Sequence, residues 1–290
     1  MRAPLIMPAR KTPVLMRIMM GLFLSLSVSG AYARTEPPAS SIVFYYGDQP
    51  TAHELNRFDL AVVEPDTGFL PRQASGAQTH WFAYVSVGET SRSRDYYAAI
   101  PKAWIIGRNR EWQSDIIDQT AEGWPAFFVD QVIAPLWEKG YTGFFLDTLD
   151  SYQLVSPGEL DKRDSQAGLI AVIRAIRHRF PAAALILNRG FELLPAIHEH
   201  VYAVAFESLF KGWSEARGQY VDVPEEDRKW LLDRVHDVMR QYGLPVIAID
   251  YCPPAQYRCS QETVERIRAL GMIPYVGDGR LQQVNFAALE

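Results

Sequence analysis

Short apolar runs alternate with longer amphipathic stretches along most of this chain. Eight of the runs have the length and composition of buried β-strands: Ile42–Tyr46, Leu60–Glu64, Trp81–Val87, Gly143–Leu146, Ala184–Leu187, Val201–Phe206, Pro245–Ile249 and Met272–Val276. The clearest helical patterns lie between them and carry apolar residues at helical spacing: Asp164–Phe180, Glu192–His200, Glu225–Tyr242 and Ser260–Leu270. This alternation predicts a parallel sheet whose faces are covered by helices.

The number of predicted strands favours a closed barrel. Eight strands within about 250 residues fit a (β/α)8 TIM barrel, and we expect residues 41–290 to form it as a single domain of the α/β class. An open doubly wound sheet is the alternative architecture. No glycine-rich fingerprint follows the first strand, which removes the usual reason to expect a dinucleotide-binding fold.

The N-terminus carries the pattern of a secretory signal peptide. Arg10, Lys11 and Arg17 precede an apolar stretch at 18–28, which is followed by a small-x-small cleavage signal at 31–33. The stretch is shorter than the roughly 20 residues that a membrane-spanning helix needs, although a retained signal anchor is the alternative. We therefore expect a signal peptide at 1–33, a linker at 34–40, and a secreted or periplasmic protein that does not bind a membrane after signal cleavage.

Charge and cysteine content exclude some classes of function. The net charge of −5 gives no basic surface for nucleic acid, so we expect no nucleic-acid partner. The two cysteines, Cys252 and Cys259, are expected to form a disulfide in an oxidising compartment. A metal site at the cysteines is not expected, because no nearby histidine completes a ligand set. We expect a monomer without a cofactor.

Acidic residues follow all but one of the eight predicted strands. Asp147 and Glu207 are the most informative, because each ends a run typical of a buried strand, where an unused charge is costly. The carboxyl ends of barrel strands line the active site, and two carboxylates facing one cleft are what cleavage of a glycosidic bond needs. So many acids at one rim also predict a cationic or polyhydroxylated ligand.

Further polar residues near the strand ends are candidates for binding that ligand: Tyr46, Asp48, Glu89, Asp150, Tyr152, Asn188, Asp250 and Tyr251. The long connection from Gly88 to Trp124 adds aromatic side chains that would either stack on sugars or cap the barrel: Tyr96, Tyr97, Trp104 and Trp112. Polar side chains in the same connection would bind sugar hydroxyls: Arg108, Asn109 and Asp115. A structural role is the alternative for each of these residues.

Three motifs carry a resemblance to known enzymes. They are GFFLDTLDSY at Gly143–Tyr152, SVGE at Ser86–Glu89 and FESL at Phe206–Leu209. They resemble glycoside hydrolase families 114 and 166, which contain endo-α-1,4-polygalactosaminidases, among them the hydrolase domain of the Pel biofilm-polysaccharide processing protein. The resemblance covers nearly all of the chain after the expected signal peptide. It implies a (β/α)8 barrel that acts on partly deacetylated N-acetylgalactosamine polymers, whereas deacetylase activity is not implied.

The resemblance also implies roles for the two carboxylates. Asp147, after the fourth predicted strand, corresponds to the nucleophile. Glu207, after the sixth, corresponds to the acid/base that protonates the leaving oxygen and then activates water. A carboxyl separation of about 5–5.5 Å indicates retention of anomeric configuration and about 6.5–9.5 Å indicates inversion. We expect retention.

The sequence leaves three other functions open. The barrel could bind a polysaccharide without cleaving it. It could also hold a divalent cation between Asp147, Glu207 and Asp250, as carboxylates at barrel strand ends do in metal-dependent enzymes. A structural protein of the cell envelope is the third alternative, and it leaves the acidic strand ends unexplained.

Overall fold

The computed structural model describes residues 39–74, 78–155 and 158–290. The expected signal peptide and all but the end of the expected linker lie outside the described residues. Within the described part of the chain, no helix is both long enough and apolar enough to cross a membrane.

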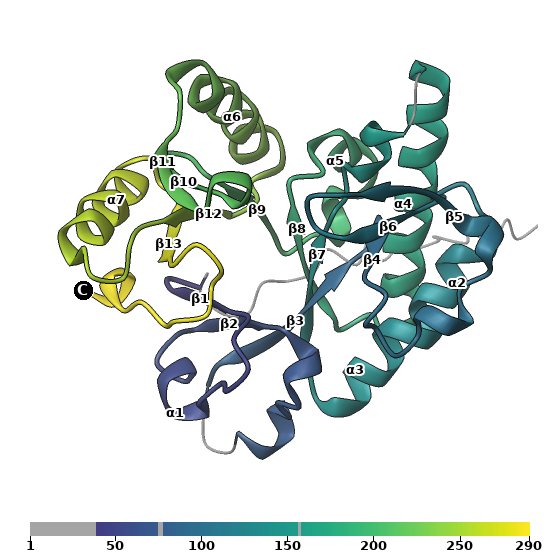
Figure 1. The fold of residues 1–290 in the computed structure, drawn as a ribbon, viewed down its shortest axis with the longest axis horizontal. Coiled ribbons are helices and arrows are strands. Elements are labelled where there is room, and N and C mark those ends of the chain that lie inside the picture. The colour runs from purple at the N-terminus through teal and green to yellow at the C-terminus, as the bar shows by residue number, and fades with distance from the viewer. Residues whose placement is uncertain (1–38, 75–77, 156–157) are drawn as a thin grey trace, which may run out of the picture. The chain divides into compact units, whose positions relative to one another are not determined.

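Eight parallel strands form a nearly closed barrel (Figure 1). In barrel order they are β1 (Ile42–Tyr45), β2 (Leu60–Val63), β3 (His80–Ser86), β7 (Gly143–Asp147), β8 (Ala184–Asn188), β9 (Ala203–Glu207), β12 (Val246–Tyr251) and β13 (Ile273–Gly277). The first and last strands are neighbours, and the Tyr275 hydroxyl donates across this seam to the Phe44 carbonyl at 3.0 Å. All eight predicted strands are confirmed, with ends that differ by one or two residues. The expectation of a TIM barrel is correct.

The strands are apolar without alternation because both of their faces are buried. Inside the barrel, the ring of Phe44 contacts the rings of Phe145 and Tyr275, with centroids 5.1 and 5.6 Å apart. Gly143 allows Phe82 to pack against β7, since a Cβ atom at this position would lie 2.3 Å from the Phe82 ring. The barrel interior is therefore a packed core, and its open space lies above the carboxyl ends of the strands.

Helices surround the barrel, with α2 to α5 on one side of Figure 1 and α6 and α7 on the other. They are α1 (Ala52–Leu55), α2 (Trp124–Phe128), α3 (Ala134–Lys139), α4 (Glu159–Arg179), α5 (Leu194–Ile197), α6 (Glu225–Asp237) and α7 (Tyr257–Ala269). A π-helical turn, η5 (Val129–Ile133), joins α2 to α3, and another, η10 (Val238–Tyr242), extends α6.

The four predicted helices are present, with one difference in continuity. The predicted helix at 192–200 is divided into the 3-10 turn η7 (Phe191–Leu193), α5 and the 3-10 turn η8 (His198–His200). Pro195 lies at the start of α5 and has no N–H to donate, so a long regular helix cannot run through it. The helices α1, α2 and α3 were not predicted.

Two of the connections between barrel strands form small antiparallel sheets, which were also not predicted. The first lies between β3 and β7 and contains β4 (Glu89–Thr90), β6 (Ser114–Ile117) and β5 (Ile105–Asn109). The second is the hairpin of β10 (Lys211–Ser214) and β11 (Gln219–Asp222), between β9 and β12. The long connection from Gly88 to Trp124 therefore contains a small sheet of its own.

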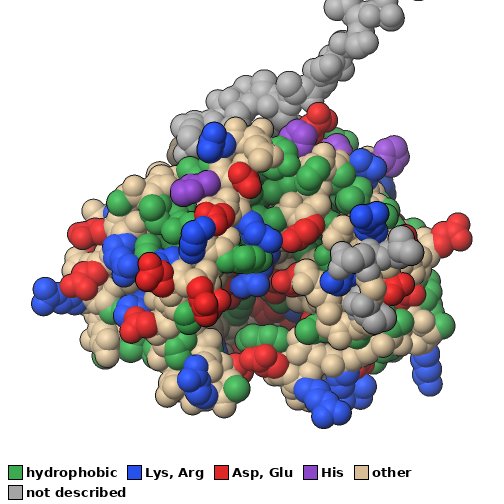
Figure 2. All heavy atoms as spheres, turned by 90° about the horizontal axis from the view of Figure 1, so that it is seen from above, with side chains coloured by type: hydrophobic (Ala, Val, Ile, Leu, Met, Phe, Trp, Pro, Cys, Tyr) green, Lys and Arg blue, Asp and Glu red, His purple; other side chains and the backbone are tan. Residues whose placement is uncertain are grey.

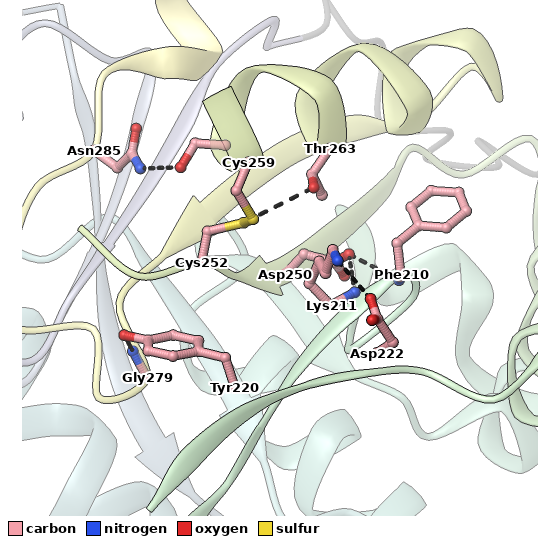
Figure 3. The surroundings of a disulfide bond; sticks show 11 residues. Phe210, Lys211, Tyr220, Asp222, Asp250, Cys252, Cys259, Thr263, Gly279 and Asn285 are labelled. Carbon is pink, nitrogen blue, oxygen red and sulfur yellow. Dashed lines mark hydrogen bonds and ion pairs between the residues drawn. A yellow bond between two sulfur atoms is a disulfide. The ribbon is translucent and has the colours of Figure 1, made fainter. Parts of the chain in front are cut away.

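A disulfide joins Cys252, just after β12, to Cys259 in the first turns of α7 (Figure 3). The two Cα atoms are 6.0 Å apart, which is an ordinary separation for a disulfide. This is the pairing expected from the sequence. The bond holds α7 against the end of β12, one residue after Tyr251.

Candidate active site

The centre of the site is a row of three residues at the ends of three adjacent strands. Asp147 is the last residue of β7, Asn188 of β8 and Glu207 of β9. Because the strands are parallel and paired in that order, their final side chains meet at one rim of the barrel. The row therefore alternates carboxylate, amide and carboxylate.

The amide of Asn188 connects the two carboxylates. Its Nδ2 atom donates to Asp147 Oδ1 at 2.8 Å and to Glu207 Oε1 at 2.9 Å. These two oxygens cannot be further apart than the two bonds laid end to end, about 5.7 Å, and they are about 5 Å apart if the N–H bonds diverge at the ~120° of a planar amide. The nearest oxygens of the two carboxylates thus face each other across a narrow gap.

A tyrosine binds the second oxygen of each carboxylate. Tyr84, from β3, donates its hydroxyl to Asp147 Oδ2 at 2.7 Å. Tyr251, from β12, donates its hydroxyl to Glu207 Oε2. A third tyrosine, Tyr46, packs against Tyr84 with ring centroids 4.9 Å apart. Burial, and next the nearby carboxylate charges, raise the pKa of all three hydroxyls well above the usual value for tyrosine, so Tyr84 and Tyr251 remain neutral donors and Tyr46 also stays neutral.

The electrostatic environment of Asp147 favours its protonated form. Burial raises the pKa of Asp147 to about 6, and the charge of Glu207 adds to the effect. Hydrogen bonds from Tyr84 and Asn188 act in the opposite direction, because they stabilise the carboxylate. The pair can therefore retain a proton up to about pH 6.

The row lies in a cleft of about 720 Å³. One wall is formed by residues of the β4–β6–β5 sheet and the connection after β7, including Asn109, Trp112 and Leu154. Glu215, after the β10–β11 hairpin's first strand, and Arg280, after β13, line another part of the cleft. Figure 2 shows one face of the molecule, on which acidic and basic side chains gather around a central hollow.

Three of the six acids that line the cleft are paired with arginines. Arg94 binds Glu64 at 2.9 Å, Arg280 binds Glu215 at 2.6 Å, and Arg189 lies 3.7 Å from Asp150. Among the described residues, no arginine partner is found for the cleft carboxylates of Asp147, Glu207 and Glu89. The cleft is therefore acidic at its centre, although the sequence predicted acids at all but one of the strand ends.

Four residues of the sequence-based candidate set lie at the cleft, where binding of substrate remains a prediction for them. Tyr46, Asp150, Asn188 and Tyr251 all line it. Of these, Asn188 and Tyr251 bind the carboxylate pair directly.

Glu89 lines the cleft, but other side chains of the protein occupy its carboxylate. Asn109 and Ser151 donate to Glu89 Oε1 at 3.0 and 2.6 Å, and Ser114 donates to Glu89 Oε2. Glu89 is only 3% exposed. Its contacts therefore support a role in joining the β4–β6–β5 sheet to the barrel, and not the expected contact with sugar hydroxyls.

The expectation that Asp250 binds substrate is wrong. Its carboxylate is fully buried and accepts hydrogen bonds from the backbone N–H groups of Leu209, Phe210 and Lys211 at 2.6, 2.8 and 2.9 Å. Figure 3 shows Asp250 beside Phe210 and Lys211. Successive side chains of a strand point to opposite faces, so Asp250 points away from the cleft once Tyr251 points toward Glu207. Asp147, Glu207 and Asp250 therefore do not converge on one cation, as the metal-dependent alternative required.

Asp48 and Tyr152 are also placed differently from the prediction. Asp48 is exposed and does not line the cleft, because the chain turns away from the barrel after β1. Tyr152 is 4% exposed, and its hydroxyl accepts a hydrogen bond from Gln166 of α4 at 2.9 Å. Among the described residues, no group of three or more His, Cys, Asp or Glu side chains is arranged to hold a metal ion.

The aromatic residues of the long connection occupy two kinds of position. Trp104 does not line the cleft, and its ring packs edge-on against Trp124 and Phe127 of α2. Trp112 lines the cleft and is 63% exposed, and Tyr96 lines it as well. Tyr97 and Arg92 bind Asp115, which is therefore engaged within the protein.

Sequence analysis did not identify Tyr84, Arg94, Glu215 or Arg280 as residues of the site. The alternation of β3 contained a usable signal for Tyr84, because residues 82, 84 and 86 share one face of the strand. No local pattern marks Arg94 or the Glu215–Arg280 pair, whose partners are 30 and 65 residues away in the sequence.

Comparisons with known proteins point to one family. A family model described as glycoside-hydrolase family GH114 matches residues 26–289. An uncharacterized protein of Deinococcus radiodurans is 28% identical over 278 residues, which cover 86% of this chain and 85% of that protein.

Two solved structures are similar as well. The glycoside hydrolase domain of PelA from Pseudomonas aeruginosa is 34% identical, with a TM-score of 0.77, over 85% of this chain and 97% of that one. Ega3 of Aspergillus fumigatus, solved in complex with galactosamine, is 14% identical, with a TM-score of 0.59, over 85% of this chain and 95% of that one. At that identity the likeness to Ega3 concerns the fold alone.

Proposed function

The chain belongs to glycoside-hydrolase family GH114 and is a glycoside hydrolase, and from this premise we propose its substrate and mechanism. It cleaves α-1,4 linkages inside partly deacetylated N-acetylgalactosamine polymers, with retention of anomeric configuration. Asp147 and Glu207 carry out the reaction. The observation that supports this proposal is that one amide nitrogen binds both carboxylates. The distance between their nearest oxygens is therefore at most about 5.7 Å.

The charge of the cleft supports an amino-sugar substrate. The arginine-free carboxylates at its centre attract a cation, and deacetylated galactosamine units carry ammonium groups at neutral pH. Ega3, which shares the fold, was solved with galactosamine bound. The volume of about 720 Å³ lies within the roughly 300–1,000 Å³ of sites that bury ligands larger than a single sugar, which suits cleavage within a polymer.

The proposed reaction has two steps. In the first, a carboxylate oxygen of Asp147 forms a bond to the anomeric carbon while the bond to the glycosidic oxygen breaks. The glycosidic oxygen keeps the electron pair of the broken bond and takes the proton of Glu207. In the second, water attacks the anomeric carbon, Glu207 takes its proton, and the carboxylate of Asp147 leaves. Tyr84 and Tyr251 hold the second oxygen of each carboxylate throughout.

We further propose that the protein is exported as its N-terminal pattern indicates, with a signal peptide at 1–33 removed. The disulfide between Cys252 and Cys259 suits an oxidising compartment. N-terminal sequencing of the protein recovered from the periplasm or medium tests this. A mature chain that still begins at Met1 would contradict signal cleavage and support a retained anchor.

The substrate is tested with purified mature protein and a partly deacetylated α-1,4-galactosamine polymer, such as galactosaminogalactan or Pel material, followed by mass spectrometry. We expect oligosaccharides from the wild type and none from Asp147→Asn or Glu207→Gln. Binding of the polymer without release of reducing ends would overturn the proposal in favour of a sugar-binding barrel.

The stereochemistry and the two roles need separate measurements. NMR of the first released product should show the α-anomer, whereas a β-anomer would exclude retention. Azide rescue of the alanine variants distinguishes nucleophile from acid/base. We expect Asp147→Ala to yield the β-glycosyl azide and Glu207→Ala the α-glycosyl azide. The opposite pair of products would make Asp147 the acid/base and Glu207 the nucleophile. The raised pKa of Asp147 is compatible with that assignment, because an acid catalyst must carry a proton.

A further inference from the structure

Asn188 has no side-chain hydrogen left to donate to a substrate. A side-chain amide nitrogen has two hydrogens, and Nδ2 of Asn188 directs one to Asp147 and the other to Glu207. Its Oδ1 atom is buried and accepts no hydrogen bond from the described residues. The side chain lines the cleft, but both hydrogens of its amide are directed at the carboxylates, so donation to a sugar does not explain it.

The orientation of this amide leaves Oδ1 buried without a hydrogen-bond donor among the described residues, which is energetically unfavourable. Another interaction must therefore favour this orientation. A buried acceptor without a partner destabilises the fold, because it loses the hydrogen bonds that it would make with water. Rotating the amide by half a turn would not help, because Oδ1 would then face two carboxylate oxygens. The amide is therefore oriented by the carboxylate pair, and the unpartnered Oδ1 atom is a consequence of that orientation.

The backbone of the three-residue row is also unusual. The residue after each member adopts a left-handed conformation although none is a glycine: Thr148 at φ 61°, Arg189 at φ 57° and Ser208 at φ 64°. Non-glycine residues rarely adopt this region, and such positions cluster at functional sites. The N–H groups of Arg189 and Ser208 bond to the next strand, at 2.7 and 2.8 Å, so the turn begins directly after the row.

We propose that Asn188 is the positioning residue of the reaction, which sets the gap between Asp147 and Glu207 by binding both carboxylates through one nitrogen. This inference rests on the proposed function. The sugar carbon and the glycosidic oxygen must both fit between the two groups, and a misplacement of about 1 Å can lower the rate by ~10²-fold. Without the bridge, two like charges would face each other with no donor between them.

The same bridge should affect ionisation. The groups facing Asp147 are Tyr84 of β3, Glu207 of β9 and Tyr46 after β1, and the groups facing Glu207 are Tyr251 of β12, Tyr46 and Asp147. Arg94 lies above the Tyr84 ring, 6.0 Å from its centroid. None of these groups donates to both carboxylates, and the hydrogen bond from Asn188 lowers the pKa of Asp147, so loss of Asn188 should raise that pKa.

The test compares Asn188→Ala and the isosteric Asn188→Asp with Asn285→Ala. Asn285 is a matched control, because its Nδ2 also donates to a side chain, Ser260 Oγ at 2.9 Å, but outside the cleft. For each enzyme, kcat and KM on the galactosamine polymer are measured between pH 4 and 9. In parallel, ¹³C NMR follows the titration of the Asp147 and Glu207 carboxyl carbons in the free protein.

We expect Asn188→Ala to lower kcat by about 10²-fold, to change KM by less than about threefold, and to move the acidic limb of the kcat profile up by about one pH unit. The NMR titrations should move in the same direction. The kcat of Asn188→Asp should fall at least as much, because the aspartate side chain keeps the shape of asparagine but supplies no hydrogen-bond donor. Asn285→Ala should keep the wild-type limb.

Three results would overturn the inference. The first is a rise in KM with unchanged kcat for Asn188→Ala, which would indicate a substrate contact. The second is an acidic limb and NMR titrations that do not move in that variant. The third is full activity of Asn188→Asp. If the wild type itself does not cleave the polymer, the proposed function fails together with the inference. An active wild type with one of the three results above refutes the inference alone.

Discussion

Replacing Asp147 by Asn should make the protein more stable at neutral pH while abolishing hydrolysis. Burial and the neighbouring charge of Glu207 raise the pKa of Asp147 from 3.8 to about 6. Between these pH values the folded state binds more protons than the unfolded state, so stability falls as the pH rises through that window. At about 1.36 kcal/mol per pKa unit, the ionised carboxylate costs the fold up to about 3 kcal/mol above pH 6.

The amide of an Asn at position 147 carries no charge at any pH, so the variant does not bear this cost. Relative to wild type, we expect its free energy of unfolding to rise by about 2 kcal/mol between pH 4 and pH 7.5. The comparison across pH matters because the local cost of fitting an NH2 group between Tyr84 and Asn188 is the same at both values and cancels.

Urea denaturation at pH 4 and pH 7.5, with the disulfide intact, measures this difference. The control is Asp233→Asn, on the exposed face of α6, where the side chain pairs only with Lys229 at 2.6 Å. Exposed pairs of this kind contribute little, so its stability should stay within about 0.5 kcal/mol of wild type at both pH values. If the stability of Asp147→Asn relative to wild type does not change with pH, Asp147 is not held in an environment that disfavours its charge.

Three further changes test other parts of the structure. Trp112→Ala should raise KM for the polymer by roughly tenfold with little change in kcat, because an exposed cleft aromatic is lost, whereas Trp230→Ala, at an exposed tryptophan outside the cleft, should leave the initial rates unchanged. Asp250→Ala should lower the free energy of unfolding by about 3 kcal/mol in urea, since three buried N–H groups lose their acceptor, and wild-type stability would contradict this role. Replacing Cys252 and Cys259 together by Ser should cost about 2 kcal/mol for the loop that the bond closes, and an unchanged melting temperature would show that the bond is dispensable.

The barrel could be predicted from the sequence because each strand is buried on both faces. A run such as Leu60–Val63 must be apolar at every position, and this pattern is visible without any knowledge of its neighbours. The two small antiparallel sheets were missed for the opposite reason. β5 alternates between exposed and partly buried residues, and β4 has only two residues, so neither carries a strong local pattern.

The candidate site was predicted in part for a similar reason. Asp147, Asn188 and Glu207 each end a strand that could be located, and parallel strands deliver their last residues to the same rim. Tyr251 was also found in this way. The roles of Glu89 and Asp250 could not be predicted, because their donors come from segments that the sequence does not show to be neighbours.

The sequence by itself determined the eight strands, their order along the chain and the residues that end them, since these follow from apolar runs and chain direction. Only the tertiary structure decided which of the acids at the rim remain available for chemistry. Asp250 and Glu207 look equivalent in the sequence, each at the end of a buried strand. One faces away from the cleft and is bound by three backbone N–H groups, and the other faces Asp147 across the amide of Asn188. The difference arises from which face of the strand each side chain occupies and from donors distant in the sequence, and both are set only when the barrel closes.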